Sequence, residues 1–385
     1  MFSVDLWVLP LGLSFLLVIS CIWVFSRMAP ALGLIDRPGG RKQHALPTPL
    51  VGGISIAFAL ALVWAFFPGA RPHYAISCGF FVLALLGVVD DRKPVPSSLK
   101  FLIQAGVACG VVALGDFRLS SVGELLPGWS PQLFWLGFPL SVFAIVSVVN
   151  AFNMCDGVDG LAGSLKLVVS LSLAVAAVIV GDSKVALSLF VLSAALLAFL
   201  SFNAPWADQR ARVFLGDAGS MGVALLIACF ALVLTNAQRG AVVPPVVALW
   251  VCALPLWDGL SVLLRRRSRG VSMMQPGRDH LHHLLQAQGR GAGRVVAIEA
   301  GSCLALSVAA IVCWQLHVPD WILVWTFVVG FAIFHLWQNR SWLALSLQVS
   351  AGHQSFSSSP PVETDPAVSY PLGGRKVVGE LTRLP

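Results

Sequence analysis

Long apolar segments alternate with short polar connections along most of the chain. A membrane-spanning helix needs about 20 apolar residues, with some tolerance for shorter ones. By that measure the sequence predicts eleven spanning helices, at residues 4–26, 51–67, 75–89, 101–115, 133–149, 161–180, 184–202, 218–235, 243–264, 295–316 and 320–338. The fourth segment is short, and the sixth contains Lys166. The pattern predicts an all-α, polytopic membrane helix bundle with about eleven transmembrane helices.

Composition supports a membrane protein. Of the 385 residues 57% are hydrophobic and 11% are charged, whereas about a quarter of a soluble chain is charged. Residues 1–340 are expected to form one membrane-embedded domain. Residues 341–385 start as a continuation of the last helix and then become rich in Ser, Pro and Gly, which predicts a largely disordered tail. The eight cysteines lie mostly in apolar segments without a CxxC motif, so neither disulfides nor a zinc site is expected.

The basic residues predict the orientation in the membrane. There are 25 Lys and Arg against 18 Asp and Glu, a formal net charge of +7. Of those 25, 20 follow odd-numbered apolar segments, 4 follow even-numbered ones, and Lys166 is the remainder. Basic residues favour the cytoplasmic side. The N-terminus is therefore expected in the periplasm and the C-terminus in the cytoplasm, and the positive charge gives no reason to expect a nucleic-acid partner.

Acidic and amide side chains gather at the predicted cytoplasmic ends. Asp90 and Asp91 follow the third segment, and "FLGDAGS" (214–220) brings Asp217 to the start of the eighth. The stretch after the fifth segment spaces four residues by three: Asn150, Asn153, Asp156 and Asp159. Five carboxylates at one membrane face would repel each other without a cation, and Mg²⁺ or Mn²⁺ suits oxygen ligands. The small neighbours of Asp217 would also let a phosphate or metal approach the helix N-terminus. Ordinary helix caps remain an alternative for each cluster.

A basic segment follows the ninth apolar run. "RRRSRG" (265–270) precedes "DHLHH" (279–283), which supplies His280, His282 and His283. The histidine spacing is not that of a structural zinc site, and histidines beside arginines suit a phosphate-binding surface. Part of the arginine run is explained by the cytoplasmic anchor of the ninth segment. Carboxylates for a metal together with basic groups for phosphates indicate phosphoryl transfer, and their place at a membrane face indicates a lipid substrate.

Five motifs together resemble the polyprenyl-phosphate N-acetylhexosamine-1-phosphate transferases of the glycosyltransferase 4 type. They are "GLIDRPGGRKQHALPTPLVGGIS" (33–55), "DDR" (90–92) with Lys100, "NAFNMCDGVDGLAG" (150–163), "VFLGDAGSM" (213–221) and "RDHLHHLL" (278–285). The H-x-H-H form of the last motif is similar to the branch that uses UDP-N-acetylglucosamine and initiates O-antigen and enterobacterial common antigen synthesis. The tail beyond about residue 340 is not covered by the resemblance.

The resemblance implies that undecaprenyl phosphate attacks the β-phosphorus of UDP-N-acetylglucosamine, with Mg²⁺ or Mn²⁺, at the cytoplasmic face of a bacterial inner membrane. It implies that the lipid bilayer surrounds the protein, and it leaves a homo-oligomer open. The catalytic residues it implies are Asp90, Asp91, Asp156 and Asp159, with Asp217 and Asn153 contacting the metal. The implied substrate-binding residues are Asn150, Lys42, Lys100, Arg265, His280, His282 and His283.

Three alternatives are left by the sequence. The same reaction with another UDP-N-acetylhexosamine, such as a deoxysugar, would use the same motifs. A secondary transporter would keep its ionisable residues near the bilayer midplane, whereas here the acidic residues lie at the ends of the apolar segments, with Asp258 and Glu299 as the exceptions. A scaffold that anchors other enzymes would need none of the Asp, Asn and His series.

Overall fold

The computed structural model describes residues 5–37, 46–205, 210–236, 242–272 and 277–357. The chain divides into two units, Met1–Ser341 and Trp342–Pro385. Of the second unit, the helical backbone up to Ser357 is described. The predicted disorder of the tail therefore falls largely on residues 358–385, which lie outside the described residues, and stays a prediction.

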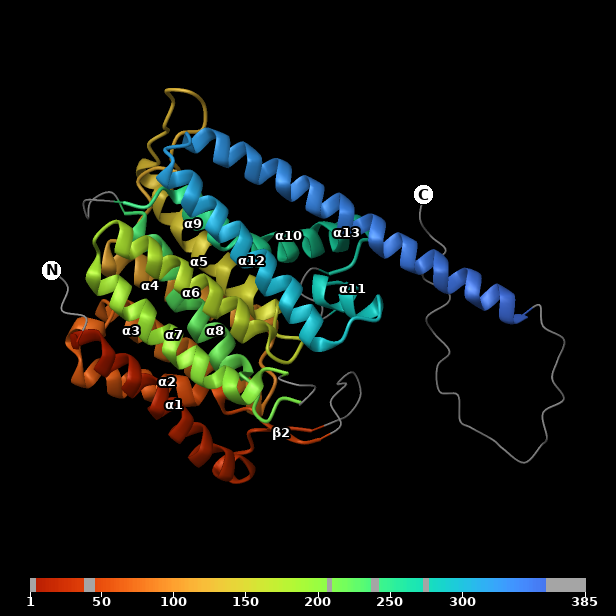
Figure 1. Cartoon of the computed structure of the whole chain (residues 1–385), viewed down its shortest axis with the longest axis horizontal. Coiled ribbons are helices and arrows are strands. Elements are labelled where there is room, and N and C mark those ends of the chain that lie inside the picture. The colour runs from red at the N-terminus through yellow and green to blue at the C-terminus, as the bar shows by residue number, and fades with distance from the viewer. Residues whose placement is uncertain (1–4, 38–45, 206–209, 237–241, 273–276, 358–385) are drawn as a thin grey trace. The chain divides into compact units, whose positions relative to one another are not determined.

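A helix lies in each of the eleven predicted apolar segments (Figure 1). The helices are α1 (Asp5–Leu32), α2 (Gly52–Phe66), α3 (Tyr74–Arg92), α4 (Ser97–Gly115), α5 (Gly137–Met154), α6 (Leu161–Ile179), α7 (Ser183–Asn203), α8 (Gly216–Leu234), α9 (Pro245–Val251), α10 (Ala253–Ser268), α11 (Leu281–Ala287), α12 (Ala292–Gln315) and α13 (Asp320–Ser357). Two-residue strands β1 (Ile35–Asp36) and β2 (Thr48–Pro49) pair in antiparallel fashion. Short 3₁₀ turns occur at Pro68–Ala70 and Phe134–Leu136.

The predicted all-α, polytopic membrane fold is confirmed. Among the described residues, nine helices are long and apolar enough to cross a membrane, or ten if the bent pair α9–α10 counts as one span. Helix α2, in the second predicted segment, has only 15 residues. The total of about eleven spans and the sides on which the two termini lie stay predictions.

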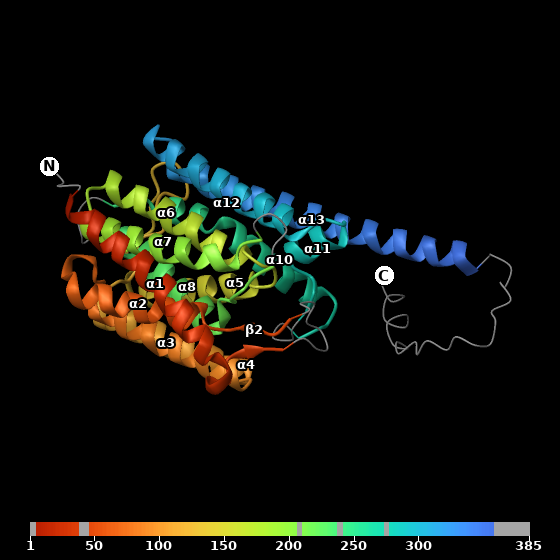
Figure 2. The ribbon, with the colours of Figure 1, turned by 60° about the horizontal axis from the view of Figure 1, so that its bottom comes forward.

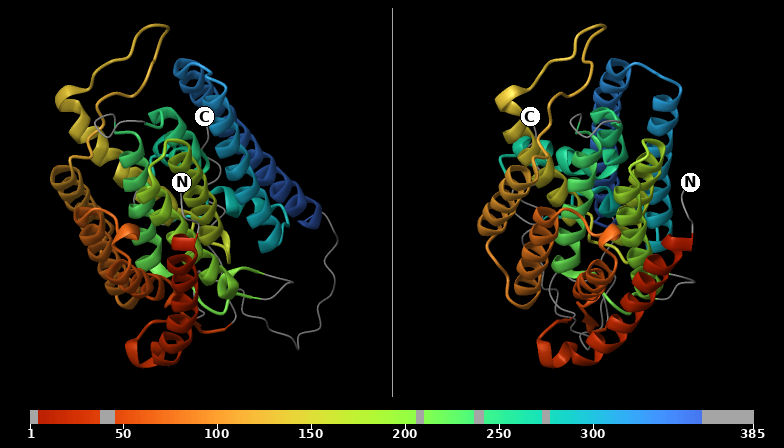
Figure 3. Two further views of the ribbon diagram at one scale, coloured as in Figure 1. Left: turned by 60° about the vertical axis from the view of Figure 1, so that its left-hand side comes forward. Right: turned by 90° about the vertical axis from the view of Figure 1, so that its left-hand side faces the viewer.

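Helix α8 is the centre of the unit Met1–Ser341. Almost every residue of α8 is buried, because it packs against α3, α5, α2 and α6 on different sides (Figures 1 and 2). Its sequence after the first turn is apolar all round, as expected of a helix enclosed by other helices. The two views of Figure 3 place α3 and α4 on one flank of the bundle and α12 on the opposite flank.

The chain runs up and down through the bundle, so that several helix ends meet. Helices α3, α5 and α7 end on the side where α4, α6 and α8 begin. Helix α5 extends five residues beyond the predicted end at 149, to Met154, and this carries Asn150 and Asn153 onto its last turns. Helix α4 begins at Ser97, which places Lys100 in its first turn. All the acidic motifs are thereby brought to one end of the bundle.

The ninth predicted segment is broken into α9 and α10, which meet at an angle of 75°. The break has a covalent cause: Pro255 has no N–H to donate to the carbonyl of Val251, four residues earlier. That carbonyl accepts hydrogen bonds from Ser307 Oγ (3.4 Å) and Cys303 Sγ (3.9 Å) of α12 instead. The freed polar group is satisfied within the protein, as it must be at membrane depth. The bend aims α10 toward α11.

Candidate functional site

Four side chains from four helices form the centre of the acidic end. Lys100 Nζ donates to Asp90 Oδ2 at 2.6 Å and lies 3.8 Å from Asp217 Oδ2. Asn153 Nδ2 donates to the other oxygen of Asp217 at 3.2 Å. The carboxyl groups of Asp90 and Asp217 also lie within hydrogen-bonding reach of each other. The cluster, called the Asp90–Asp217 cluster below, joins α3, α4, α5 and α8 through one lysine, two acids and one asparagine.

Asp91 is held differently from Asp90, its neighbour in sequence. Its Oδ1 accepts the backbone N–H of Asp217 at 2.9 Å, and its Oδ2 accepts that of Ala218 at 3.4 Å. These N–H groups belong to the first turn of α8, which has no intrahelical partners for them. Asp91 therefore caps α8 from a different helix, and its charge is favoured by the positive end of the helix dipole. Asp91 thus accepts two of the N–H groups at the start of α8, and the expected approach of a phosphate or metal to this helix end stays a prediction.

Glycines let α8 come this close. A Cβ on Gly87 of α3 would collide with the backbone of Asp217 and Ala218, and one on Gly53 of α2 would collide with the backbone of Gly219. Gly53 also donates its N–H to the carbonyl of Leu215 at 2.8 Å. The glycines around Asp217 thus serve helix packing, and they fix the position of its carboxylate.

The turn between α5 and α6 carries the next group of predicted residues. Asn150 Nδ2 donates to Gln104 Oε1 at 2.7 Å and to the carbonyl of Val146 at 2.8 Å, so this amide braces α5 against α4. Asp159 Oδ2 accepts the N–H of Ala211 at 3.0 Å and ties the turn to the loop before α8. Asp156 is exposed and close enough to Asp91 for their charges to interact. Asp159 is therefore the aspartate of this turn that the structure ties to the described part of that loop.

The three histidines around the start of α11 have unequal access to solvent. His280 and His282 are 6% and 1% exposed, whereas His283 is partly exposed. His282 Nε2 lies where a Cβ of residue 157 would be, so Gly157 is needed to seat this ring against the α5–α6 turn. Burial, reinforced by the neighbouring His283 and His280, lowers the pKa of His282 to about 3. His282 is therefore a neutral imidazole at neutral pH, and His283 is the histidine best placed to meet a ligand.

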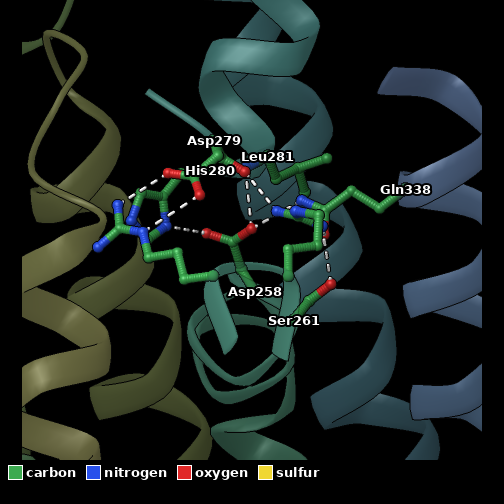
Figure 4. A network of polar contacts seen from close by, with 8 residues as sticks. Asp258, Ser261, Asp279, His280, Leu281 and Gln338 are labelled. Carbon is green, nitrogen blue, oxygen red and sulfur yellow. Dashed lines mark hydrogen bonds and ion pairs between the residues drawn. The ribbon is translucent and has the colours of Figure 1, made fainter. Parts of the chain in front are cut away.

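Arg265 and His280 belong to a buried polar network (Figure 4). Arg265 donates to Ser261 Oγ at 3.0 Å and to Gln338 Oε1 at 2.6 Å, and also to the carbonyl of Asp279. His280 Nδ1 lies 2.8 Å from Asp258 Oδ2. Both residues are predicted to bind substrate, but here the Nη atoms of Arg265 and Nδ1 of His280 are directed to other side chains and backbone.

Arg266 pairs with Asp279 at 2.8 Å. Burial opposes ionisation of Asp279, but the hydrogen bonds from Arg266 outweigh it and lower the pKa of this carboxyl group. The pair fixes the connection into α11 beside the Arg265 network. Arg266 and Asp279 are not among the residues that the sequence singled out.

The predicted site residues thus fall into two neighbouring groups. The Asp90–Asp217 cluster, Asp91 and Asp156 form one, and α11 with the Arg265 network forms the other; they meet where His282 contacts Gly157. Lys42 lies outside the described residues. Among the described residues, no three His, Cys, Asp or Glu side chains are arranged to bind a metal ion together. The sequence did not predict a role for Gln104, Asp258 or Gln338, because single polar residues inside apolar segments carry no motif.

The chain is similar to proteins of known description. The model of glycosyl transferase family 4 matches residues 73–235. The undecaprenyl-phosphate alpha-N-acetylglucosaminyl 1-phosphate transferase of Escherichia coli O157:H7 is 32% identical over 333 residues, covering 85% of this chain and 90% of the relative. The protein of the same name from Salmonella typhi is 30% identical over 332 residues with the same coverage. The probable undecaprenyl-phosphate N-acetylglucosaminyl 1-phosphate transferase of Bacillus subtilis (strain 168) is 31% identical over 282 residues, covering 72% of this chain and 76% of the relative.

The close approach of α3 to α8 leads to a first prediction. In Gly87→Ala the new methyl group must push the first turn of α8 away, which strains a packed core by about 1–3 kcal/mol. We expect a lower melting temperature in detergent. Gly106→Ala is the matched control, because a Cβ at Gly106 of α4 meets no atom within 4 Å. If Gly87→Ala had the same melting temperature as Gly106→Ala, the packing explanation would be wrong.

Proposed function

This chain belongs to the polyprenyl-phosphate N-acetylhexosamine-1-phosphate transferases of glycosyl transferase family 4, and we propose that it transfers N-acetylglucosamine 1-phosphate from UDP-N-acetylglucosamine to undecaprenyl phosphate. The products are N-acetylglucosaminyl-diphosphoundecaprenol and UMP. The names of the relatives give undecaprenyl phosphate as the acceptor and N-acetylglucosaminyl 1-phosphate as the group transferred, and UDP-N-acetylglucosamine as the donor is part of the proposal. The observation that carries the proposal is the Asp90–Asp217 cluster, which unites two carboxylates and a lysine at a bundle end.

The reaction needs charge control more than covalent chemistry. A phosphate oxygen of undecaprenyl phosphate attacks the β-phosphorus, and the bond from that phosphorus to the bridging oxygen breaks as UMP leaves. Both reactants are anions, so a site must hold them in line and neutralise their charge. We favour direct attack, because the lipid phosphate is a competent nucleophile once its charge is screened.

The donor set of the cluster suits Mg²⁺ or Mn²⁺. Mg²⁺ typically binds one or two protein carboxylates and takes its other ligands from phosphates and water. Asp90 and Asp217, which both lie close to Lys100 Nζ, would supply such a pair of carboxylates. Asp217 and Asp90 would hold the ion, with Asn153 orienting Asp217. When bound, the ion would neutralise negative charge on the phosphate oxygens.

Residues of the chain supply the remaining functions. Lys100, already between two acids, would exchange part of its pairing with Asp90 for a phosphate oxygen of the substrate. Asp156, which is exposed beside the cluster, would contact the nucleotide-sugar. His283, next to the start of α11, would contact its diphosphate. Asp91, Asp159, Asn150, His280 and Arg265 would act by holding the helices and loops in place.

The alternatives differ in how well the geometry supports them. Another UDP-N-acetylhexosamine would fit the same acidic and basic groups, so the donor is the least constrained part of the proposal. A secondary transporter is disfavoured, because its ionisable residues would lie at the midplane, whereas Asp90, Asp156 and Asp217 lie at or next to helix ends. We further propose that the active end faces the cytoplasm of a bacterial inner membrane and that the product feeds lipopolysaccharide assembly, either O-antigen or enterobacterial common antigen.

The proposed donor can be tested directly. The purified full-length protein is incubated with undecaprenyl phosphate, Mg²⁺ and, one at a time, a panel of UDP-sugars that includes deoxy and epimeric N-acetylhexosamines. We expect UMP release with UDP-N-acetylglucosamine, loss of release when EDTA is added, and recovery with excess Mg²⁺ or Mn²⁺. Release with a different donor alone would correct the substrate, and release unaffected by EDTA would remove the metal.

Asp217→Asn tests the acidic cluster. The amide keeps the shape of the side chain but removes a negative oxygen, and we expect kcat for UMP release to fall about 100-fold or more. The matched control is Asp182→Asn, since Asp182 caps α7 through the N–H of Val185 at 3.0 Å at the opposite end of the bundle. Equal kcat values in the two variants would exclude Asp217 from the reaction.

The orientation is tested with a membrane-impermeant thiol reagent on intact cells. Arg71→Cys and Lys93→Cys introduce thiols at exposed positions in the connections before and after α3. We expect Arg71→Cys to react from outside and Lys93→Cys to react only after the membrane is opened. The parent chain, which contains exposed Cys78 and Cys109, gives the background. The reverse labelling pattern would place the acidic end in the periplasm.

A further inference from the structure

We propose that Asp258 is a positioning residue for the transfer, acting through His280 to hold α11 against the α5–α6 turn. The kinetic part of this inference rests on the proposed function, and the structural part does not. Asp258 lies in α10, just beyond the break at Pro255, and does not belong to the acidic motifs. It is only 3% exposed.

Three donors converge on the Asp258 carboxylate (Figure 4). Oδ2 pairs with His280 Nδ1 at 2.8 Å, and Oδ1 accepts the N–H of Leu281 at 2.8 Å and Gln338 Nε2 at 2.9 Å. The first two donors are consecutive residues at the start of α11. A single carboxylate thus fixes both the ring that precedes α11 and the first N–H of the helix. The third donor comes from α13, so α10, α11 and α13 meet at this group.

Stability alone does not explain a carboxylate at this place. Burying a charge costs several kcal/mol before its partners compensate, and apolar side chains of similar volume often replace a buried ion pair without loss of stability. Apolar side chains, however, could not fix the orientation of the His280 ring, because they accept no hydrogen bond. The carboxylate accepts a hydrogen bond from Nδ1–H of His280. A hydrogen bond of this kind fixes both the tautomer and the ring orientation of a histidine.

Contacts between the histidine rings link the orientation of His280 to the positions of His282 and His283. His280 and His282 stack with centroids 5.6 Å apart and an interplanar angle of 4°, and His282 sits on Gly157 of the turn that carries Asp156. His283, whose ring centroid lies 4.2 Å from that of His282, is left partly exposed. Rotation of His280 would therefore shift His282 and move His283 relative to Asp156.

The test uses Asp258→Asn, which keeps the shape of the side chain. One amide oxygen can still accept from Leu281 or Gln338, but the amide NH₂ facing His280 is a donor, so His280 Nδ1 must lose its proton and change tautomer. The matched control is Glu299→Gln, because Glu299 of α12 is also 3% exposed and its Oε1 has no hydrogen-bond partner among the described residues. His280→Gln and the double variant Asp258→Asn/His280→Gln complete a cycle.

Two measurements are made on the full-length protein. Hydrogen–deuterium exchange of the segment Leu281–Ala287 without substrate reports whether α11 is held, and steady-state kinetics with UDP-N-acetylglucosamine reports its consequence. We expect faster exchange and a loss in kcat of about 10–100-fold in Asp258→Asn, with neither change in Glu299→Gln. We expect the double variant to lose no more activity than the worse single variant, since both act through one ring.

The outcomes separate the two proposals. Unchanged exchange in Asp258→Asn, faster exchange with unchanged kcat, or additive losses in the double variant would each overturn the positioning role. If the wild-type protein released no UMP from UDP-N-acetylglucosamine, the proposed function would fail. The exchange measurement would still report whether Asp258 holds α11.

Discussion

The geometry of the site depends on how the first turn of α8 is held. Asp91 accepts the N–H groups of Asp217 and Ala218, and glycines of α2 and α3 allow the backbones to touch there. Helix N-termini commonly bind a phosphate, but this one is satisfied by a carboxylate of the protein itself. The result is an Asp217 side chain on a rigid, central helix, directed at Asp90, Lys100 and Asn153. Chemistry that depends on in-line approach of two phosphates needs such rigidity, because small errors in position are costly.

A second constraint fixes the part of the site formed by α11 and the Arg265 network. Pro255 breaks the ninth apolar segment, and the resulting bend carries Asp258 and Arg265 toward α11. Buried polar bonds then join α10, α11 and α13. This part of the site contacts the acidic part where His282 lies against Gly157. Helix breaks at membrane depth occur in proteins where they line functional sites, and here the break orients a polar network rather than opening the backbone to a ligand.

The sequence predicts the helices well, because most of the apolar runs are long and many of their ends are marked by Gly, Pro, Asn or Asp. It also predicts that Asp90, Asp156 and Asp217 lie at one end, since alternating helix directions leave little choice. It could not assign different surroundings to Asp90 and Asp91. Their separation into a partner of Lys100 and a cap of α8 depends on where α8 lies, 126 residues further along the chain. Partners such as Asp258 and Gln338, 80 residues apart, leave no local pattern that a reader could recognise.

The balance of charges at the acidic end supports our proposal that this end binds a divalent cation. Asp91 is compensated by two backbone N–H groups, and Asp90 by Lys100. Asp217 shares that lysine at 3.8 Å and receives an uncharged amide from Asn153, so its charge is only partly balanced, while Asp156 adds another acid nearby. A site with this surplus of acids would bind two phosphates poorly by itself. The same acids favour phosphate binding if a divalent cation lies between them and the substrates, which is why we place the ion at Asp90 and Asp217 rather than beside the histidines.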